Sequence, residues 1–191
     1  MSVVSVAPFC YNHRMNVWSP SSSEDLLIAE LQAWGLHYLI GALPASAAPG
    51  LSADMLLAEL ARQKDARVRS ALIPLLLQNP DLASAVPKAL SHLNPYDQWT
   101  LKVYYTAAVI LQDEFAPASP SAESRQRLLP DYFSSELGIE VTASCEERLH
   151  QLGEFHAQHA DLRANWPETY RHAAQIWMRH LREGEDGRHS C

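Results

Sequence analysis

Glutamate and histidine side chains gather on one predicted helix, and these residue types can hold a metal ion or move protons. Glu147, His150 and Glu154 lie at positions i, i+3 and i+7 of a helix expected over residues 146–160, so they share one face. Glu-x-x-His is half of the ligand set of di-iron helical bundles, but such a site needs a second copy, and the sequence has none. A solvated face with Glu–His pairs therefore explains this pattern better than a metal or acid–base site.

Two further histidines follow on the same helix. His156 and His159 are three residues apart, so both imidazoles could reach one metal ion. They also lie near an apolar stripe that begins at Leu149, and a histidine in such a place commonly sits half-buried and hydrogen-bonded. A metal would need further ligands from elsewhere, such as His172, and the sequence does not predict that geometry. We expect no cofactor and keep a metal-dependent helical enzyme, built on both groups, as an alternative function.

Basic side chains form two groups that a partner could contact. Arg67 and Arg69 lie two residues apart on a predicted helix, where an ion pair with an acidic residue of the next repeating hairpin explains them more simply than phosphate binding does. His172, Arg179 and Arg182 share the polar face of the last predicted helix. The helix dipole already favours basic residues in a last turn, so these side chains do not by themselves require a ligand.

The densest aromatic cluster spans residues 96–105 and includes Tyr96, Trp99 and two further tyrosines. Tyr96 and Trp99 lie beside a helix start, where they could form a recognition hot spot, because Tyr and Trp dominate such sites. Core packing is nevertheless the commoner role for a residue such as Trp99. We keep both residues as candidates for partner binding.

Capping residues and apolar periodicity predict helices along most of the chain. Ser21-Ser22-Ser23-Glu24 has capping-box spacing and opens a helix whose apolar face runs from Leu27 to Tyr38. Pro167 occupies the first position of a last helix that Glu183-Gly184 is expected to close. Convincing strand patterns are absent from the sequence, so we predict an all-α protein.

The segment Lys64–Leu72 carries the most specific pattern in the chain. Asp65 can cap a helix in which Val68 and Leu72 point inward, while Ala71 allows a neighbouring helix to approach closely. The helix is expected to continue, kinked at Pro74, to about residue 78. An offset of 33 residues aligns this region with the next predicted hairpin, which suggests weak internal repetition.

On these residues, the segment 51–112 resembles HEAT-type helical repeats, although it contains fewer repeats than a long solenoid. The resemblance implies stacked helical hairpins with a surface that binds another protein chain, and it implies no catalytic residues. Residues 1–20 lack a helical period, and residues 116–121 form a Pro/Ser/Ala run. We predict a flexible arm over 1–20, a helical-hairpin stack over 21–115, a linker at 116–121 and a C-terminal helical subdomain over 122–191.

Composition narrows the classes of function. The chain has 191 residues and a formal net charge of −7, which argues against nonspecific binding of nucleic acid. Cys10, Cys145 and Cys191 lack the spacing of a metal or redox site, which favours free thiols and a cytoplasmic location. No stretch approaches the roughly 20 apolar residues that a membrane span requires.

Familiar enzyme motifs, including the P-loop and Gly-x-Ser-x-Gly, are also absent from the sequence. The leading prediction is a non-enzymatic, protein-binding adaptor or a neutralising or regulatory subunit, comparable to an antitoxin or immunity protein. The two alternatives are the metal-dependent enzyme and a helical nucleic-acid binder that uses Arg62, Arg67, Arg69 and the basic face of the last helix.

Overall fold

The computed structural model describes residues 23–40, 50–115, 128–160 and 164–186. All regular structure in these ranges is helical, with no strand among them, which confirms the predicted all-α class. The predicted arm over 1–20, the linker at 116–121 and the first residues of the predicted C-terminal subdomain lie outside the described residues.

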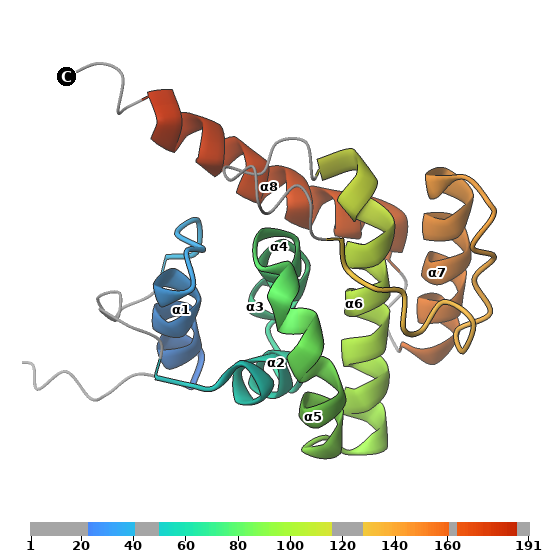
Figure 1. Cartoon of the computed structure of the whole chain (residues 1–191), viewed down its shortest axis with the longest axis horizontal. Helices are drawn as coiled ribbons and strands as arrows, with labels where there is room; N and C mark the ends of the chain where they lie inside the picture. Colours follow the sequence, from blue (N-terminus) through green and yellow to red (C-terminus); the bar gives the residue numbers. More distant parts are fainter. Residues whose placement is uncertain (1–22, 41–49, 116–127, 161–163, 187–191) are drawn as a thin grey trace, which may run out of the picture.

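The helices follow one another in the order labelled in Figure 1. They are α1 (Ser23–Ala33), α2 (Ala53–Ala61), α3 (Ala66–Ser70), α4 (Leu72–Gln78), the 3-10 helix η1 (Pro80–Ala85), α5 (Val86–Ser91), α6 (Pro95–Phe115), α7 (Cys145–His159) and α8 (Trp166–Asp186). The last helix extends past the predicted end at Glu183-Gly184. In the described part of the chain, no helix is both long and apolar enough to span a membrane.

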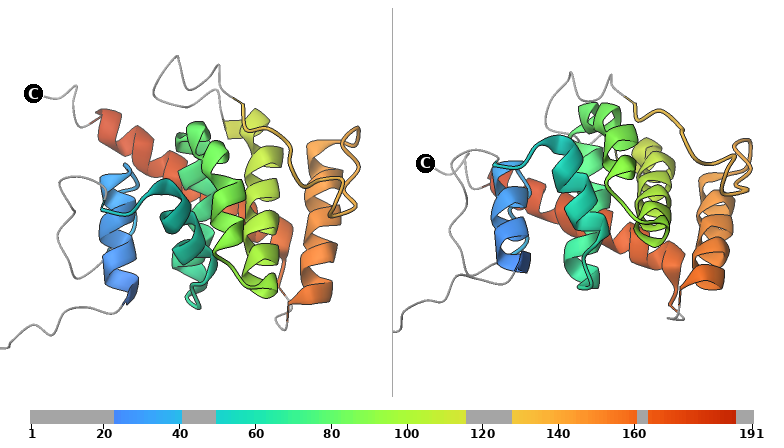
Figure 2. Two further views of the ribbon diagram at one scale, coloured as in Figure 1. Left: turned by 60° about the horizontal axis from the view of Figure 1, so that its bottom comes forward. Right: turned by 90° about the horizontal axis from the view of Figure 1, so that it is seen from below.

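Helix α8 crosses a row of the other helices. Figure 2 shows α1, the group α2–α5, α6 and α7 standing side by side, with α8 running along the row. Contacts of α8 with α4, α6 and α7 hold it there. A single apolar core contains Leu31, Leu57, Leu76, Tyr105 and Trp177, so the helices that follow the predicted linker share the core of the earlier ones.

The Asp65 cap forms as predicted. Its carboxylate accepts hydrogen bonds from the backbone N–H of Arg67 at 2.7 Å and of Val68 at 3.3 Å. The following helix is divided into α3 and α4 at Ala71 rather than merely kinked. Pro74 explains the break, because it has no N–H for the carbonyl of Ser70 and its ring crowds that carbonyl.

The first helix is shorter than its apolar periodicity predicts. It ends at Ala33, and the N–H groups of Gly35 and Leu36 turn back to the carbonyls of Gln32 and Leu31 in a Schellman motif. This motif requires a left-handed residue, and Gly35 has a φ of 92°. The apolar residues expected to share one helical face up to Tyr38 are therefore split between the helix and the turn.

A hydrogen bond connects α8 to the end of α4. The indole Nε1 of Trp177 donates to Oε1 of Gln78 at 2.8 Å. The next residue, Asn79, donates from its side chain to the backbone oxygen of Trp34 at 3.4 Å. A segment after α1, the end of α4 and the middle of α8 therefore meet at one point, which fixes where α8 crosses the row.

Candidate partner-binding site

A pocket of about 400 Å³ opens between α3 and α8, and we call it the α3–α8 pocket. Its walls come mainly from one face of each helix, with further side chains from α6 and from the segments next to α1 and α8. It is lined by Tyr38, Ala66, Arg67, Arg69, Ser70, Tyr104, Ala164, Trp166, Thr169, His172, Ala173 and Ile176. Three of the predicted partner-binding residues, Arg67, Arg69 and His172, therefore meet at one site.

Arg67 lies at the exposed rim of the α3–α8 pocket. Its guanidinium pairs with the carboxylate of Glu24 in α1 at 2.8 Å, and 55% of its side chain remains exposed. The sequence predicted an ion pair with an acidic residue of the next repeat, but the partner is Glu24 of α1, which precedes the segment 51–112. Because an exposed pair of this kind contributes only about 0–1 kcal/mol, Arg67 can turn toward a ligand at little cost.

Arg69 lies deeper, where its position is fixed by two contacts. Its Nη1 donates to the backbone oxygen of Gln63 at 2.8 Å, and its guanidinium carbon lies 6.0 Å from the centre of the Tyr104 ring. Its Nε is buried and has no acceptor among the described residues. The guanidinium is thus held in place while its Nε donor is unused.

The back of the pocket is a stack of aromatic rings from α7 and α8. The imidazole of His156 stacks on the indole of Trp166 at 3.5 Å, and its Nδ1 shares a hydrogen bond of 2.6 Å with the hydroxyl of Tyr170. Burial, aided by the positive charges of Arg69 and His159, lowers the pKa of His156 to about 3. Burial also raises the pKa of Tyr170, so both groups are neutral at pH 7. The wall behind the two arginines is therefore uncharged at pH 7.

The residues of the metal hypothesis are engaged elsewhere. Glu147 accepts hydrogen bonds from the backbone and hydroxyl of Ser144 in a capping box at the start of α7. His150 and Glu154 form an exposed pair at 3.8 Å. His156 faces Tyr170 in the core, whereas the ring of His159 stacks on Phe155.

No group of three His, Cys, Asp or Glu side chains within the described ranges is placed to hold a metal ion. The two predicted groups of ligands therefore do not converge: His150 and Glu154 are exposed on one side of α7, whereas His156 is buried on another. The solvated-face interpretation agrees with the exposed positions of His150 and Glu154.

Tyr96 and Trp99 contribute to a second feature, which we call the α6–α7 aromatic surface: Tyr96, Trp99, Phe155 and His159. The ring of Trp99 lies 6.0 Å from Tyr96, 6.3 Å from Phe155 and 5.5 Å from His159. Tyr96 is 61% exposed, while Trp99 is partly buried against the core. Trp99 also meets His156 edge-on at 5.0 Å, so aromatic contacts connect this surface to the back of the α3–α8 pocket.

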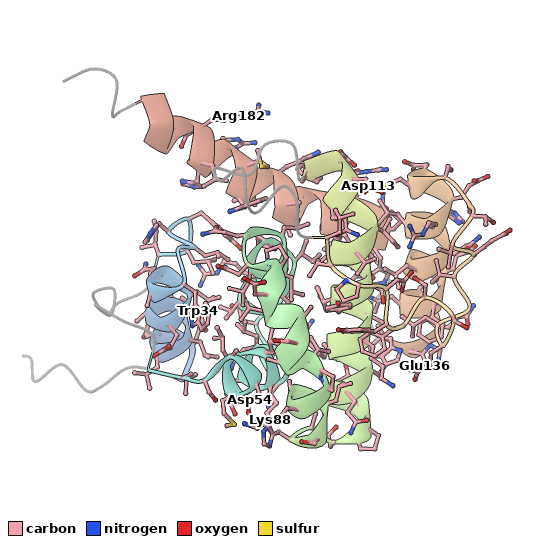
Figure 3. All side chains as sticks on the ribbon, viewed as in Figure 1. Trp34, Asp54, Lys88, Asp113, Glu136 and Arg182 are labelled. Carbon is pink, nitrogen blue, oxygen red and sulfur yellow. The ribbon has the colours of Figure 1, made fainter. Side chains whose placement is uncertain are left out.

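Arg179 and Arg182 lie away from His172, although the sequence placed all three on one polar face. They line a separate pocket of about 450 Å³ between the end of α6 and α8, together with Glu114 and Glu183. Figure 3 shows Arg182 pointing away from the other helices. The length of α8 explains the separation, because its first turns face α3 and its later turns pass the end of α6.

Sequence reasoning missed Trp166 and Ile176 as walls of the α3–α8 pocket, and Tyr38 at its edge. Trp166 lies about 100 residues from α3, and only the crossing of α8 brings the two together. The Trp-Pro pair at the start of α8 was the available signal, since it predicts a buried indole at a helix start.

Comparison of the chain with protein-family models, with curated proteins and with solved structures finds no match.

Proposed function

We propose that this protein is a non-enzymatic adaptor or regulatory subunit that binds another protein, and that the α3–α8 pocket holds an anchoring side chain of that partner. The observation that carries the proposal is the meeting of Arg67, Arg69 and His172 around the rings of Tyr104 and Trp166. Arg, Trp and Tyr are the residues that dominate the energetic centres of protein interfaces. A volume of about 400 Å³ suits one or two large side chains.

The α6–α7 aromatic surface supports the same function. Tyr96 exposes a large aromatic ring to solvent next to Trp99 and Phe155. A stable interface needs about 800 Å² on each partner, which is more than one pocket supplies. The aromatic surface provides additional area for a partner that is anchored in the pocket.

The resemblance of residues 51–112 to HEAT-type repeats agrees with this proposal, because such repeats bind other chains through their helical surfaces. A net charge of −7 is also compatible with a subunit that neutralises a basic partner, as an antitoxin or immunity protein does. The partly buried Cys145, whose thiol pKa is raised by burial, behaves as a free structural thiol and is compatible with a cytoplasmic location.

Affinity capture from the cells that make the protein tests the proposal. Three forms are compared: the unchanged chain, a double variant with Arg67→Ala and His172→Ala, and a matched control with Arg179→Ala and Arg182→Ala. We expect one protein to co-purify stoichiometrically with the unchanged chain and the control, and to be reduced at least tenfold with the first variant. Recovery of the chain alone, or equal capture by all three forms, would contradict the proposal.

A further inference from the structure

The charge around the α3–α8 pocket is opposite to that of the whole chain. The net charge is −7, yet Arg67, Arg69 and His172 line this pocket, and none of its lining residues is acidic. Glu24 pairs with Arg67 but is not part of the lining. The occupant therefore meets basic groups at the rim without a competing carboxylate among the residues it would touch.

The second pocket, which lies between the end of α6 and α8, allows a comparison of charge within the same molecule. It also contains two arginines, Arg179 and Arg182, but Glu114 and Glu183 line it with them. Acidic and basic groups are balanced in that pocket, so it has no preference for an anion. A lining with arginines and no acidic residue is thus a property of the α3–α8 pocket, where the one carboxylate paired with an arginine, that of Glu24, lies outside the lining.

The guanidinium of Arg69 has the donors that an anion requires. One donor is used by the backbone oxygen of Gln63, while Nε has no acceptor among the described residues. The indole Nε1 of Trp166, in the same wall, is also buried without an acceptor among them. A donor that is buried without a partner is unfavourable, because it has lost its hydrogen bonds to water. Small rotations of the two side chains would let an acceptor in the pocket recover part of that cost.

The apolar walls restrict the kind of anion. Ala173, Ile176, Trp166 and Tyr104 provide carbon surface next to Arg69. An anion that fits there must be carried beside an apolar group, and arginine binds a carboxylate through two parallel hydrogen bonds. A polyphosphate chain lacks such an apolar group, and the net charge of −7 opposes its approach.

We infer that the α3–α8 pocket recognises an acidic side chain of the partner protein that is flanked by apolar residues, with the carboxylate on Arg69 and the apolar neighbour against Trp166 and Ile176. This inference rests on the proposed function, since it names the chemistry of the anchoring residue. Arg67 adds positive charge at the rim, and the imidazole of His172 beside it offers a further hydrogen-bonding group to the entering carboxylate.

A matched pair of short peptides tests this chemistry without knowledge of the partner. The probes are Ac-Gly-Leu-Glu-Leu-Gly-NH₂ and its twin with Gln in place of Glu, titrated into the ¹⁵N-labelled full chain and followed by NMR. We expect the Glu peptide to shift amide signals of α3 and the first turns of α8, and to bind at least tenfold more tightly than the Gln twin. Equal binding of the two peptides, or no binding of either, would overturn the inference.

Variants of the protein locate the preference. Arg69→Gln should abolish the difference between the two peptides, whereas the matched control Arg179→Gln should preserve it. Because Arg69 also holds the Gln63 carbonyl, Arg69→Lys provides a second variant that retains the charge and should retain part of the preference. A preference that survives Arg69→Gln would place the carboxylate elsewhere and refute the assignment.

A third peptide carries phosphoserine in place of Glu, and tighter binding of this peptide would show that the recognised group is a phosphate and not a carboxylate.

Failure of this inference can be distinguished from failure of the proposed function. If affinity capture gives a partner that depends on Arg67 and His172 while the peptides do not discriminate, the inference is wrong and the adaptor function stands. If no partner is captured, the function itself is wrong.

Discussion

The imidazole of His156 and the hydroxyl of Tyr170 share a hydrogen bond of 2.6 Å in the core, where α7 packs on α8. Trp166 stacks on the imidazole with the ring centroids 3.5 Å apart, and the rings of Trp99 and Tyr104 meet it edge-on, so the histidine is enclosed by aromatic rings. A charged imidazolium there would lose its hydration without gaining an anionic partner. This contact therefore makes the packing of α7 on α8, and with it the back of the α3–α8 pocket, dependent on a neutral histidine.

Acidification should destabilise the protein through His156. Burial lowers its pKa from 6.5 to about 3, so the unfolded chain binds a proton that the folded chain excludes as the pH falls from 6.5 to about 3. Between pH 7 and pH 5 this difference should lower the free energy of unfolding by about 2 kcal/mol. Urea unfolding at the two pH values measures the effect.

The control for this prediction is His156→Gln, which can still form a hydrogen bond to Tyr170 but cannot titrate. Its free energy of unfolding should be lower at pH 7, because the stacking on Trp166 changes, but it should lose about 2 kcal/mol less between pH 7 and pH 5. An identical pH dependence in the two proteins would show that His156 is not the responsible group.

A second pH effect should appear in a lower range. In α2, the carboxylate oxygen Oδ2 of Asp54 lies 3.1 Å from Nζ of Lys88 and 3.0 Å from Nε2 of His92. Figure 3 shows Asp54 and Lys88 next to each other. The hydrogen bond from Lys88 is the main reason that the pKa of Asp54 is lowered to about 2. Its contribution to stability is therefore present above about pH 4 and is lost as the pH falls toward 2.

Asp54→Asn should accordingly lower the melting temperature at pH 6, and the difference from the unchanged chain should shrink as the pH falls from 4 toward 2. Thermal unfolding followed by circular dichroism at several pH values checks this. A melting difference that is constant over that range would mean that the charge of Asp54 does not connect α2 to α5.

Two glycines with positive φ allow a matched test of the contact between the turn after α1 and the end of α4. An added Cβ at Gly35 would lie 2.3 Å from Nε2 of Gln78, whereas at Gly138 it would meet nothing within 4 Å. Gly138→Ala should therefore lower the free energy of unfolding by about 1–2 kcal/mol, which is the cost of placing alanine in a left-handed backbone conformation. Gly35→Ala should cost about 1 kcal/mol more, because Gln78 must move away from Trp177.

Urea unfolding of the two glycine variants at pH 7 gives this difference directly. Trp177→Phe, which removes the donor to Gln78, should cancel most of the extra cost of Gly35→Ala in the double variant. Equal costs at Gly35 and Gly138 would show that Gln78 can move without losing its bond to α8.

Tyr96→Ala separates binding from stability on the α6–α7 aromatic surface. The ring is largely exposed, so its removal should change the free energy of unfolding by less than about 0.5 kcal/mol. If the partner covers this surface, the same change should weaken binding about tenfold, which corresponds to about 1.4 kcal/mol. The control is Leu26→Ala, at a similarly exposed position on α1, which should leave both quantities unchanged.

Local rules predicted the helices well but not where they end or meet. Asp65 caps α3 because the capping geometry involves only the next three residues, and the effect of Pro74 is equally local. The end of α1 was misplaced, because apolar periodicity continues past Gly35 although the backbone does not. The helical period cannot show that a Schellman turn interrupts an apolar face.

The candidate site needed information that single-helix patterns do not contain. The sequence identified Arg69 and His172 as candidates, but not that they lie in the same pocket. They come together because α8 crosses α4 and α6 at a position that the hydrogen bond between Trp177 and Gln78 fixes. The same crossing carries Arg182 away from them. The site is formed by contacts between residues about 100 positions apart in the sequence. Capping residues and apolar periodicity describe single helices and do not predict such contacts.

Site-specific photo-crosslinking tests the central claim most directly. Benzoylphenylalanine is placed at Thr169, which lines the pocket, or at Gln175 on α8, which does not, and the full chain is irradiated in the cells that produce it. The α3–α8 pocket predicts a single protein adduct from position 169 that is absent or much weaker from position 175. Adducts of equal yield from both positions, or none from position 169, would contradict the assignment of this pocket as the partner-binding site.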